Sequence, residues 1–339
     1  MQLNEIWFLI VGFLFIGYFV LDGFDFGVGM SLPFLGKDDT DRRVLINSIG
    51  PVWDLNETWV IVAGASLFAA FPEWYASLFS GFYLPLLLIL AALIMRGVAF
   101  EYRGKGHTIG ADETKWKSRF DWMIVIGSAL PALLWGVAFA NIVQGVPLNK
   151  DHIYTGTLFT LLNPYGLLGG LVTLTLFFTH GLVFITLKTD GDIKDRARAL
   201  ATKVGVVATV LAAIFLVWTL VAHFSVLGFI LTALAALSLI AALFANHVKR
   251  EGVSFSLLVF TIITAVGSLF AALFPNVFPS STDPAFSLTI ENASSSEYTL
   301  TVMTWVAVVM IPLVLVYQGW TYWVFRKRVS RKSIPAGSH

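Results

Sequence analysis

Two carboxylates lie in an apolar segment near the start of the chain. The stretch YFVLDGFDFGVGM at 18–30 places Asp22 and Asp25 among aromatic residues and glycines, with no Lys or Arg before them. A second pair, Asp54 and Glu57, follows in GPVWDLNETW. Both pairs have the i, i+3 spacing that puts two side chains on one face of a helix. Carboxyls in such surroundings can bind and pass protons, provided that they face protein or water rather than lipid.

Arg96, in LIMRGVAFEYR, is the basic residue that falls within an apolar run. We expect its guanidinium to offset one carboxylate, while water or protonation relieves the others. Local alternatives exist for each group. Asp22 or Asp54 can cap a helix end, Glu57 can be solvated at a helix entrance, and Arg96 can extend to lipid phosphates. Five ionisable groups at one depth favour a shared site instead.

The composition is that of a membrane protein. Of the 339 residues, 57% are hydrophobic and 13% are charged, about half the charged fraction of soluble domains. Apolar runs of 18 or more residues recur, and each can cross a hydrocarbon core of roughly 30 Å. The sequence therefore predicts an all-α polytopic membrane protein, with lipid as a partner and no nucleic acid. The absence of cysteine excludes disulfides, thiolate metal sites and thiol catalysis.

The apolar runs predict nine spans. Their approximate limits are 6–30, 53–72, 77–100, 122–143, 158–187, 203–224, 226–246, 253–274 and 300–325. The first lacks the basic flank and cleavage site of a signal peptide, so we expect it to be retained. Short joins predict tight hairpins between the second and third spans and between the sixth and seventh. The segment from Pro275 to Thr299 is expected to form an ordered cap.

Basic residues alternate between the loops. Of the 22 Lys and Arg residues, 20 lie in the first, third, fifth and seventh loops and the C-terminal tail, whereas the opposite loops hold only Lys150. The positive-inside rule then places the N-terminus outside and the C-terminus in the cytoplasm. Asp22, Asp25, Asp54, Glu57 and Arg96 converge in this arrangement near the cytoplasmic ends of three consecutive helices.

Ligands for a metal are scarce. His180, in FFTHGLVF, is the one histidine well inside a span. A core histidine bonded to a neighbouring helix is the expected interpretation, and a haem ligand is the alternative. Paired intramembrane histidines, which hold haem or copper in other proteins, are missing. If the protein takes part in redox chemistry, we expect the metal to be held elsewhere.

Seven motifs distributed over the chain match one known family. They are DGFDFGVGM (22–30), RRVLINSIGPVWDLNETWVIVAGASLFAAFP (42–72), SGFYLPLLLILAALIMRGVAFEYR (80–103), GVAFANIVQGVP (136–147), LLNPYGLLGGL (161–171), FPNVFPSST (274–282) and TLTVMTWVAVVMIPLVLVY (299–317). Through them the chain resembles subunit II of cytochrome bd quinol oxidases over essentially its whole length. The least diagnostic part is the middle, about 188–250.

The resemblance implies a fold of nine transmembrane helices, arranged as two four-helix bundles and one peripheral helix. A single membrane domain at 1–333 would contain a first bundle at about 1–143, a second bundle at 158–274 and the ninth helix at 300–325. The last residues, 334–339, are set apart as a tail with the composition of a cloning remnant.

The resemblance also implies the partners and cofactors. Subunit I would carry two b-type haems and haem d and oxidise quinol, while this chain would bind no haem and have no redox centre. The two would form a heterodimer in the bacterial plasma membrane, with a small single-span accessory subunit as a further candidate partner. A structural quinone is a candidate ligand of this chain. The assembled complex is expected to be an oxygen-reducing oxidase, whereas the isolated chain is not expected to be catalytic.

Residue by residue, the resemblance assigns the proton-pathway aspartate to Asp54. The acids of the DGFD motif fall on Asp22 and Asp25, and the intramembrane arginine of the family falls on Arg96.

Trp53 joins Arg96 as a candidate residue near the interface with the haem-bearing subunit. Two positions depart from the usual pattern of the family. Leu55 follows the WD dipeptide where many members have glycine, and Glu57 replaces a glutamine found in some members. Leu55 could narrow a water path, whereas Glu57 could add a proton carrier.

These residues lead to one mechanistic hypothesis. Asp22 and Asp25 would line the cytoplasmic mouth of a hydrated pocket shared with Asp54 and Arg96, and protons taken up there would reach haem d in subunit I. Two alternatives are a purely structural subunit of the same oxidase and a proton-coupled secondary transporter. The transporter is less favoured, since no convincing repeat is found and the charges cluster at one face rather than the midplane.

Overall fold

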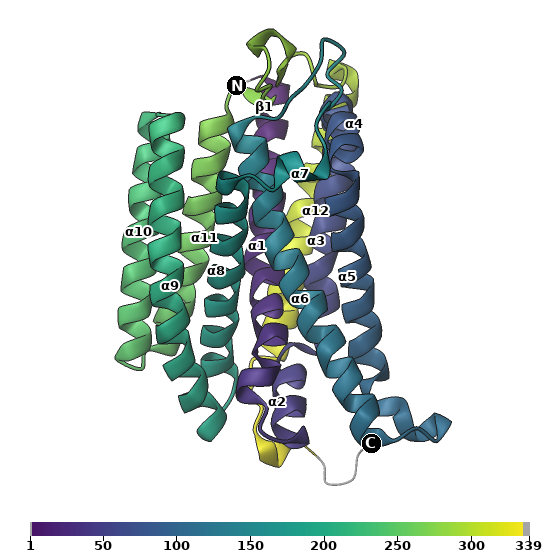
Figure 1. Cartoon of the computed structure of the whole chain (residues 1–339), viewed down its shortest axis with the longest axis vertical. Helices are drawn as coiled ribbons and strands as arrows, with labels where there is room; N and C mark the ends of the chain where they lie inside the picture. The colour runs from purple at the N-terminus through teal and green to yellow at the C-terminus, as the bar shows by residue number, and fades with distance from the viewer. Residues whose placement is uncertain (1, 335–339) are drawn as a thin grey trace.

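The computed structural model describes residues 2–334. The predicted tail 334–339 thus lies outside the described residues except for Ile334, which is buried against the rest of the protein. Within this range the chain is almost entirely helical and forms an elongated bundle (Figure 1). The α-helices are α1 (Leu3–Leu35), α2 (Asp39–Ile49), α3 (Trp53–Ala70), α4 (Pro72–Gly81), α5 (Tyr83–Tyr102), α6 (Glu113–Gln144), α7 (Leu158–Leu161), α8 (Pro164–Lys188), α9 (Asp192–Ala222), α10 (Val226–His247), α11 (Glu251–Leu273) and α12 (Glu297–Val324). Short elements complete the chain, namely the 3-10 helices η1 (Arg103–Ile109), η2 (Pro284–Phe286) and η3 (Arg331–Ser333) and the strands β1 (Asn276–Phe278) and β2 (Leu288–Thr289).

Eight helices of the described chain are long and apolar enough to cross a membrane. They are α1, α5 with η1, α6 and α8 to α12. The second predicted span, α3, is not among them, because its first two turns carry Asp54, Asn56 and Glu57 and it has only 18 residues. It still lies against α1 along the bundle (Figure 1). Nine membrane-spanning helices therefore remain a prediction.

The structure corrects two predicted boundaries. The predicted hairpin after the second span is instead bridged by α4, because the backbone leaves the helical conformation at Phe71 and again at Phe82. Pro72 then occupies the first turn of α4, a position that proline favours. The fifth span begins at Pro164 rather than 158, since Asn163 caps the new helix by accepting from Gly166 N. The predicted tight join between α9 and α10 is confirmed.

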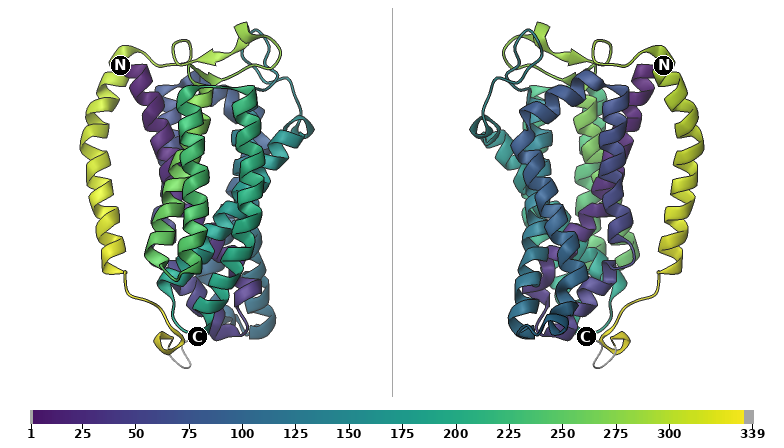
Figure 2. Two further views of the ribbon diagram at one scale, coloured as in Figure 1. Left: turned by 90° about the vertical axis from the view of Figure 1, so that its left-hand side faces the viewer. Right: turned by 90° about the vertical axis from the view of Figure 1, so that its right-hand side faces the viewer.

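Helix α1 is the central element. It packs against α3 and α6 on one side and against α8 and α11 on the other, while α8 to α11 also pack on one another. By contrast, α12 stands at the edge of the bundle (Figure 2), and only 6% of its most apolar stretch is buried. The division into two bundles at 1–143 and 158–274 stays a prediction, with α1 in contact with helices of both groups.

Glycines bring α1 and α8 into backbone contact. A Cβ atom on Gly27 would lie 2.1 Å from the carbonyl oxygen of Phe177, and one on Gly181 would lie 2.4 Å from the Cα of Gly27. Small residues at helix crossings allow this approach in membranes. The backbones of α1 and α8 are therefore in direct contact two residues beyond Asp25.

Replacing Gly181 with alanine should lower the free energy of unfolding by about 1–3 kcal/mol, since the added methyl group must push two backbones apart. Thermal unfolding of the purified protein in detergent measures the change. Gly64→Ala in α3 is the matched control, because a Cβ there meets no atom within 4 Å and alanine favours helix by up to about 1 kcal/mol. Equal melting temperatures for the two variants would contradict the close crossing.

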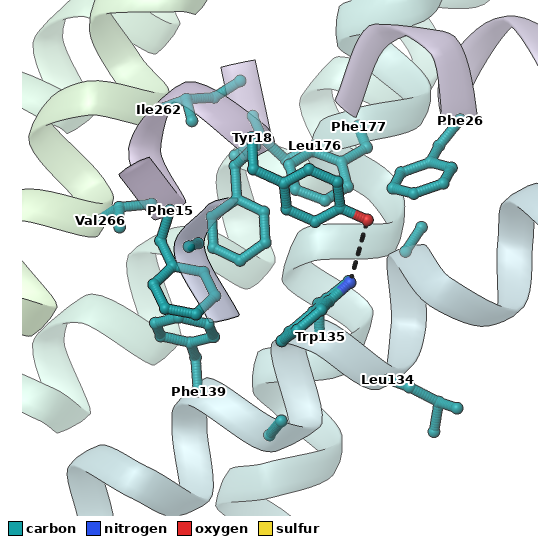
Figure 3. Close-up of a cluster of buried hydrophobic side chains, with 14 of the residues drawn as sticks. Phe15, Tyr18, Phe26, Leu134, Trp135, Phe139, Leu176, Phe177, Ile262 and Val266 are labelled. Carbon is teal, nitrogen blue, oxygen red and sulfur yellow. Dashed lines mark hydrogen bonds between the residues drawn. The ribbon is translucent and has the colours of Figure 1, made fainter. Parts of the chain in front are cut away.

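Aromatic residues fill the centre of the bundle next to the acids of α1. Phe15 and Phe19 pack edge-to-face against Phe139, and Trp135 donates from Nε1 to the hydroxyl of Tyr18 at 3.2 Å (Figure 3). All of these residues are buried. The polar residues that follow along α1 therefore begin directly next to a buried aromatic core.

The two ends of the molecule differ. Strands β1 and β2 pair antiparallel in a cap at the end where α1 begins. Two backbone hydrogen bonds attach the cap to the segment after α6: Val146 N donates to the carbonyl oxygen of Pro279, and Ser281 N donates to the carbonyl oxygen of Val146. The segment 275–299 is thus the ordered cap that the sequence predicts. Helix α2 and the chain after α12 lie at the opposite end (Figure 1). This end carries the basic loops, and its cytoplasmic location remains a prediction from their charge.

Candidate functional site

Arg96 is the centre of a buried ionic cluster. Its side chain, on α5, has no exposed surface, and its Nη2 donates to Asp22 Oδ1 on α1 at 2.6 Å and to Glu57 Oε2 on α3 at 2.9 Å. The guanidinium also lies over the ring of Phe26, 4.5 Å from its centroid. One cation thus joins three helices. The Arg96 side chain is directed into the protein and does not extend to lipid phosphates.

Asp25 is also fully buried, but its partner is neutral. Its Oδ2 accepts from Asn56 Nδ2 at 2.7 Å, and the same nitrogen reaches the carbonyl oxygen of Leu21 at 3.3 Å. Asn56 lies on α3 between Asp54 and Glu57 and has no exposed surface. The amide of Asn56 therefore holds Asp25 in place without neutralising a charge.

Helix α12 closes the cluster from a distant part of the sequence. Asn56 Oδ1 accepts from Gln318 Nε2 at 2.9 Å and from the hydroxyl of Tyr322 at 2.8 Å. Trp59 Nε1 donates to Gln318 Oε1 at 3.4 Å. Sequence reasoning missed Asn56, Gln318 and Tyr322. A usable signal was present for Gln318, a lone amide within the last apolar run.

The cluster has more acid than base. Arg96 bonds to Asp22 and Glu57, while Asp25 lies beside them and bonds to neutral Asn56, so three carboxyls stand near one guanidinium. Some buried atoms also lack a hydrogen-bond partner among residues 2–334, namely Asp22 Oδ2, Asp25 Oδ1 and Arg96 Nε and Nη1. Buried polar groups normally have partners. Spare acceptor atoms beside a cation give this site room for protons or water.

Exposure divides the acids into two groups. Asp54 is exposed and the Glu57 side chain is 21% exposed, whereas Asp22 and Asp25 are entirely enclosed. The hypothesis that Asp22 and Asp25 line an open mouth is therefore wrong for this chain. Pairing with Arg96 and Asn56 makes their burial tolerable, so they form the inner part of the site.

The local alternatives can now be compared with the structure. Helix α1 continues to Leu35, so Asp22 lies within a helix and caps no terminus. Asp54 lies in the first turn of α3, where Val52 is the N-cap residue and no side chain caps the helix. In the described part of the chain, Asp54 makes no hydrogen bond or ion pair. It is the one predicted site acid that is not joined directly to the cluster.

Trp53 and Leu55 flank this exposed acid. The Trp53 ring is half-buried and packs on Phe100, with ring centroids 5.0 Å apart. It also lies 3.4 Å from the position of a Cβ on Gly97, the residue after Arg96. Trp53 thus packs on the part of α5 that follows Arg96, while Leu55 is half-buried on the same turn of α3.

His180 is occupied by protein contacts. Its Nε2 lies 3.1 Å from the carbonyl oxygen of Val20, and its ring stacks on Phe255 with centroids 4.9 Å apart. This is the expected arrangement of a core histidine bonded to a neighbouring helix, and the other ring nitrogen, Nδ1, is buried without a hydrogen-bond partner among residues 2–334. We assign no cofactor step to His180.

A second charged cluster fastens the end of the molecule where α2 lies. Asp41 on α2 is buried and pairs with Arg196 Nη2 at 2.8 Å and with Arg331 Nη1. Arg331 also donates to Asp38, and these hydrogen bonds lower the pKa of Asp38 below its ordinary value. The hydrogen bonds between Asp38 and Arg331 therefore stabilise the protein at neutral pH, and this contribution is lost as the pH falls through the lowered pKa of Asp38. The cluster anchors the chain after α12 to α2.

Comparisons with known proteins agree over nearly the whole chain. A family model described as cytochrome bd terminal oxidase subunit II matches residues 3–325. The chain is 44% identical to cytochrome bd ubiquinol oxidase subunit 2 of Bacillus subtilis, with 98% of each chain covered. It is 40% identical to cytochrome bd-I ubiquinol oxidase subunit 2 of Escherichia coli K12, with 99% of this chain and 98% of the relative covered.

The fold is also found among solved structures. The bd oxidase from Geobacillus thermodenitrificans aligns with a TM-score of 0.77 over 96% of this chain and 100% of the matched chain. The sequence identity in that alignment is 18%, so this likeness bears on the fold alone.

Proposed function

The chain belongs to the cytochrome bd terminal oxidase subunit II family, and we propose that it supplies protons from the cytoplasm to the oxygen-reducing centre of the complex. As a member of this family it is a multi-pass subunit of a quinol oxidase in a bacterial membrane. The acid-rich cluster around Arg96 carries the proposal, because Arg96 bonds to both Asp22 and Glu57 with Asp25 close by, and ionisable residues buried at membrane depth commonly belong to proton relays.

The partner in this proposal is subunit I, and the heterodimer is the working unit. The two b-type haems and haem d belong to subunit I, where they supply quinol oxidation and oxygen reduction. Residues of the present chain bind and release protons and position the path. A small accessory subunit remains a further candidate partner.

The proposed route has an outer and an inner part. Protons enter at exposed Asp54 and partly exposed Glu57, which lie one helical turn apart on α3. Arg96 keeps its own proton and holds the Glu57 and Asp22 carboxyls side by side on its Nη2, so that a proton can pass between the acids, and Asp25 lies one turn further along α1. Uptake from the cytoplasm, with quinol protons released outside, would build a proton motive force without a pump. This direction rests on the orientation predicted from the basic loops.

The finer architecture is part of the same proposal. Helix α3 would be the ninth membrane-spanning helix, with its polar first turns held inside the complex by Arg96 and α12. The groups at 1–143 and 158–274 would be two four-helix bundles, and α12 the peripheral helix.

A quinone is the remaining ligand in the proposal. An apolar cavity of about 220 Å³ is bordered by α1, α6 and α8 to α11, with Phe19, Trp135 and Leu176 in its wall. Its walls suit part of an isoprenoid chain. The ligand would be structural, since the cavity contains no ionisable residue in its lining.

Asp54→Asn tests the entrance of the route. Oxygen consumption by the assembled complex should fall roughly three- to tenfold at saturating quinol. This loss is smaller than the 10²–10⁴ typical of a direct acid–base group, because Glu57 still offers a second carboxylate. Oxygen-electrode rates per haem d measure the effect.

Asp195→Asn is the matched control, since the Asp195 side chain is 73% exposed on α9 and bonds only to neighbouring Arg198. It should leave the rate unchanged. Normal oxygen consumption in Asp54→Asn, with wild-type haem content, would exclude Asp54 from the route and favour the purely structural role.

A further inference from the structure

A cavity of about 600 Å³ opens at the end of the molecule where α2 lies. Its walls come from the end of α2 and the following turn, the last turn of α8, the start of α11 and the end of α12 with the chain that follows. We call it the basic pocket, defined by Phe184, Lys188, Phe255, Tyr322, Lys327 and Arg328. It is separate from the Arg96 cluster, although Tyr322 borders both.

The inner wall of the basic pocket is aromatic. Phe184 and Phe255 pack with ring centroids 5.8 Å apart, and both pack on Phe24 of α1. Val52, Leu187 and Val324 extend this apolar wall. An occupant of the inner part must therefore be apolar.

The rim is strongly cationic. Lys188, Arg326, Lys327 and Arg328 all line the pocket, and its lining includes no Asp or Glu. Arg328 pairs with Asp190 outside the lining at 2.8 Å, and Arg326 lies over Trp323. Three of the four cations thus have no carboxylate partner among residues 2–334. A fixed excess of positive charge at the rim attracts an anion.

The rim is held rigidly in place. Val329 N donates to the carbonyl oxygen of Lys188 at 2.8 Å, and Lys188 Nζ donates to the carbonyl oxygens of Lys327 and Phe325. From Val329 the chain continues at this end of the bundle to Arg331, which bonds to Asp38 of the turn before α2 (Figure 2). The cations are therefore carried by a segment that hydrogen bonds hold against α8, rather than by a free tail.

We propose that the basic pocket binds an anionic phospholipid, with an acyl chain against the aromatic wall and the phosphate among the cations of the rim. The pocket lies where the last turns of membrane-crossing helices meet a basic loop. This position corresponds to the depth of the lipid headgroups. Basic pockets between helices bind anionic headgroups in this way. A quinone offers no negative charge to the rim, and inorganic phosphate leaves the aromatic wall unused.

The test uses the complete oxidase, transferred into nanodiscs of phosphatidylcholine with a small fraction of phosphatidylglycerol, and then washed in detergent. Native mass spectrometry counts the phosphatidylglycerol retained per complex. Wild type should retain it, and Arg326→Gln/Lys327→Gln should bind it about 25-fold more weakly, because each basic residue near an anionic headgroup contributes about fivefold in affinity. Glutamine keeps a donor for the Trp323 carbonyl that Arg326 now contacts.

Two further variants make the result specific. Lys105→Gln/Lys115→Gln removes two cations in η1 and α6 that do not line the pocket, and should retain the lipid fully. Val324→Trp keeps every cation but fills the apolar wall, and should lose the lipid while haem content shows normal assembly.

Undiminished retention in Val324→Trp, or equal losses in both double variants, would overturn the proposal. So would displacement of the lipid by inorganic phosphate alone, or a quinone in place of phospholipid in the retained mass.

Discussion

Replacing Arg96 with methionine is expected to lower the stability of the protein by about 3–5 kcal/mol, the usual cost of removing one partner from a buried ion pair. Methionine fills much of the same volume, so packing alone contributes little to the loss. Asp22 would remain without exposed surface and without a cation, and Glu57 would lose its bond to Arg96. We expect little assembled complex and a lower melting temperature in what assembles.

Two further variants show whether the loss of stability comes from the buried ion pair or would follow the removal of any paired arginine. Arg42→Met removes a residue whose side chain is 35% exposed and whose partner, Asp121, keeps Arg103 at 2.6 Å. That variant should lose about 1 kcal/mol or less. Arg96→Met/Asp22→Asn should recover part of the stability, because the uncompensated carboxylate is removed together with its cation. Equal melting temperatures for Arg96→Met and Arg42→Met would contradict a buried ionic centre.

The charged core of this site could be predicted because carboxylates and a guanidinium are chemically unusual in apolar runs. Asp22 and Asp25 stand out in an apolar run, and Arg96 is the basic residue within a predicted span. Charges at membrane depth must find one another or water. The sequence predicts that Arg96 offsets one carboxylate, and the structure shows ion pairs with two, Asp22 and Glu57.

The contribution of α12 could not be predicted in the same way. Gln318 and Tyr322 meet Asn56 across 262 and 266 residues of sequence. Hydropathy locates a helix but does not say which neighbour it contacts. The exposure of Asp22 and Asp25 was misjudged for a related reason. Spacing along α1 shows that they share a face, whereas their enclosure depends on side chains of other helices, such as Arg96 and Asn56, that pack around them.

Polarity also obscured α2 and α3. Helix α2 is charged and lies at one end of the bundle, so a search for apolar runs passes over it. Helix α3 was found from its apolar second half, but its first turns are too polar to qualify as a span by composition. In both cases ionic partners from other helices stabilise the element. Asp41 of α2 pairs with Arg196 and Arg331, and Glu57 of α3 pairs with Arg96.

Asp25→Asn should give the largest loss of activity, with oxygen consumption per haem d reduced about 10- to 100-fold. Asparagine can accept the hydrogen bond that Asp25 takes from Asn56 Nδ2 at 2.7 Å, so the local geometry should survive. The substituted side chain cannot take up and release a proton. The loss approaches the range of a direct proton-transfer group because Asp25 has no exposed neighbouring acid to replace it. Proton uptake, followed with a pH-sensitive dye after oxygen is added to the reduced complex, should slow in parallel.

Asp41→Asn is the instructive comparison, since Asp41 is equally buried but belongs to the second charged cluster at the end of the bundle. It should reduce the amount of assembled complex and leave the rate per haem d nearly unchanged, the opposite pattern to Asp25→Asn. Of these two buried carboxylates, Asp25 would then carry protons, whereas Asp41 would stabilise the structure through its ion pairs. If Asp25→Asn instead behaves like Asp41→Asn, with normal proton uptake in every assembled complex, the acids around Arg96 hold helices together and carry no protons.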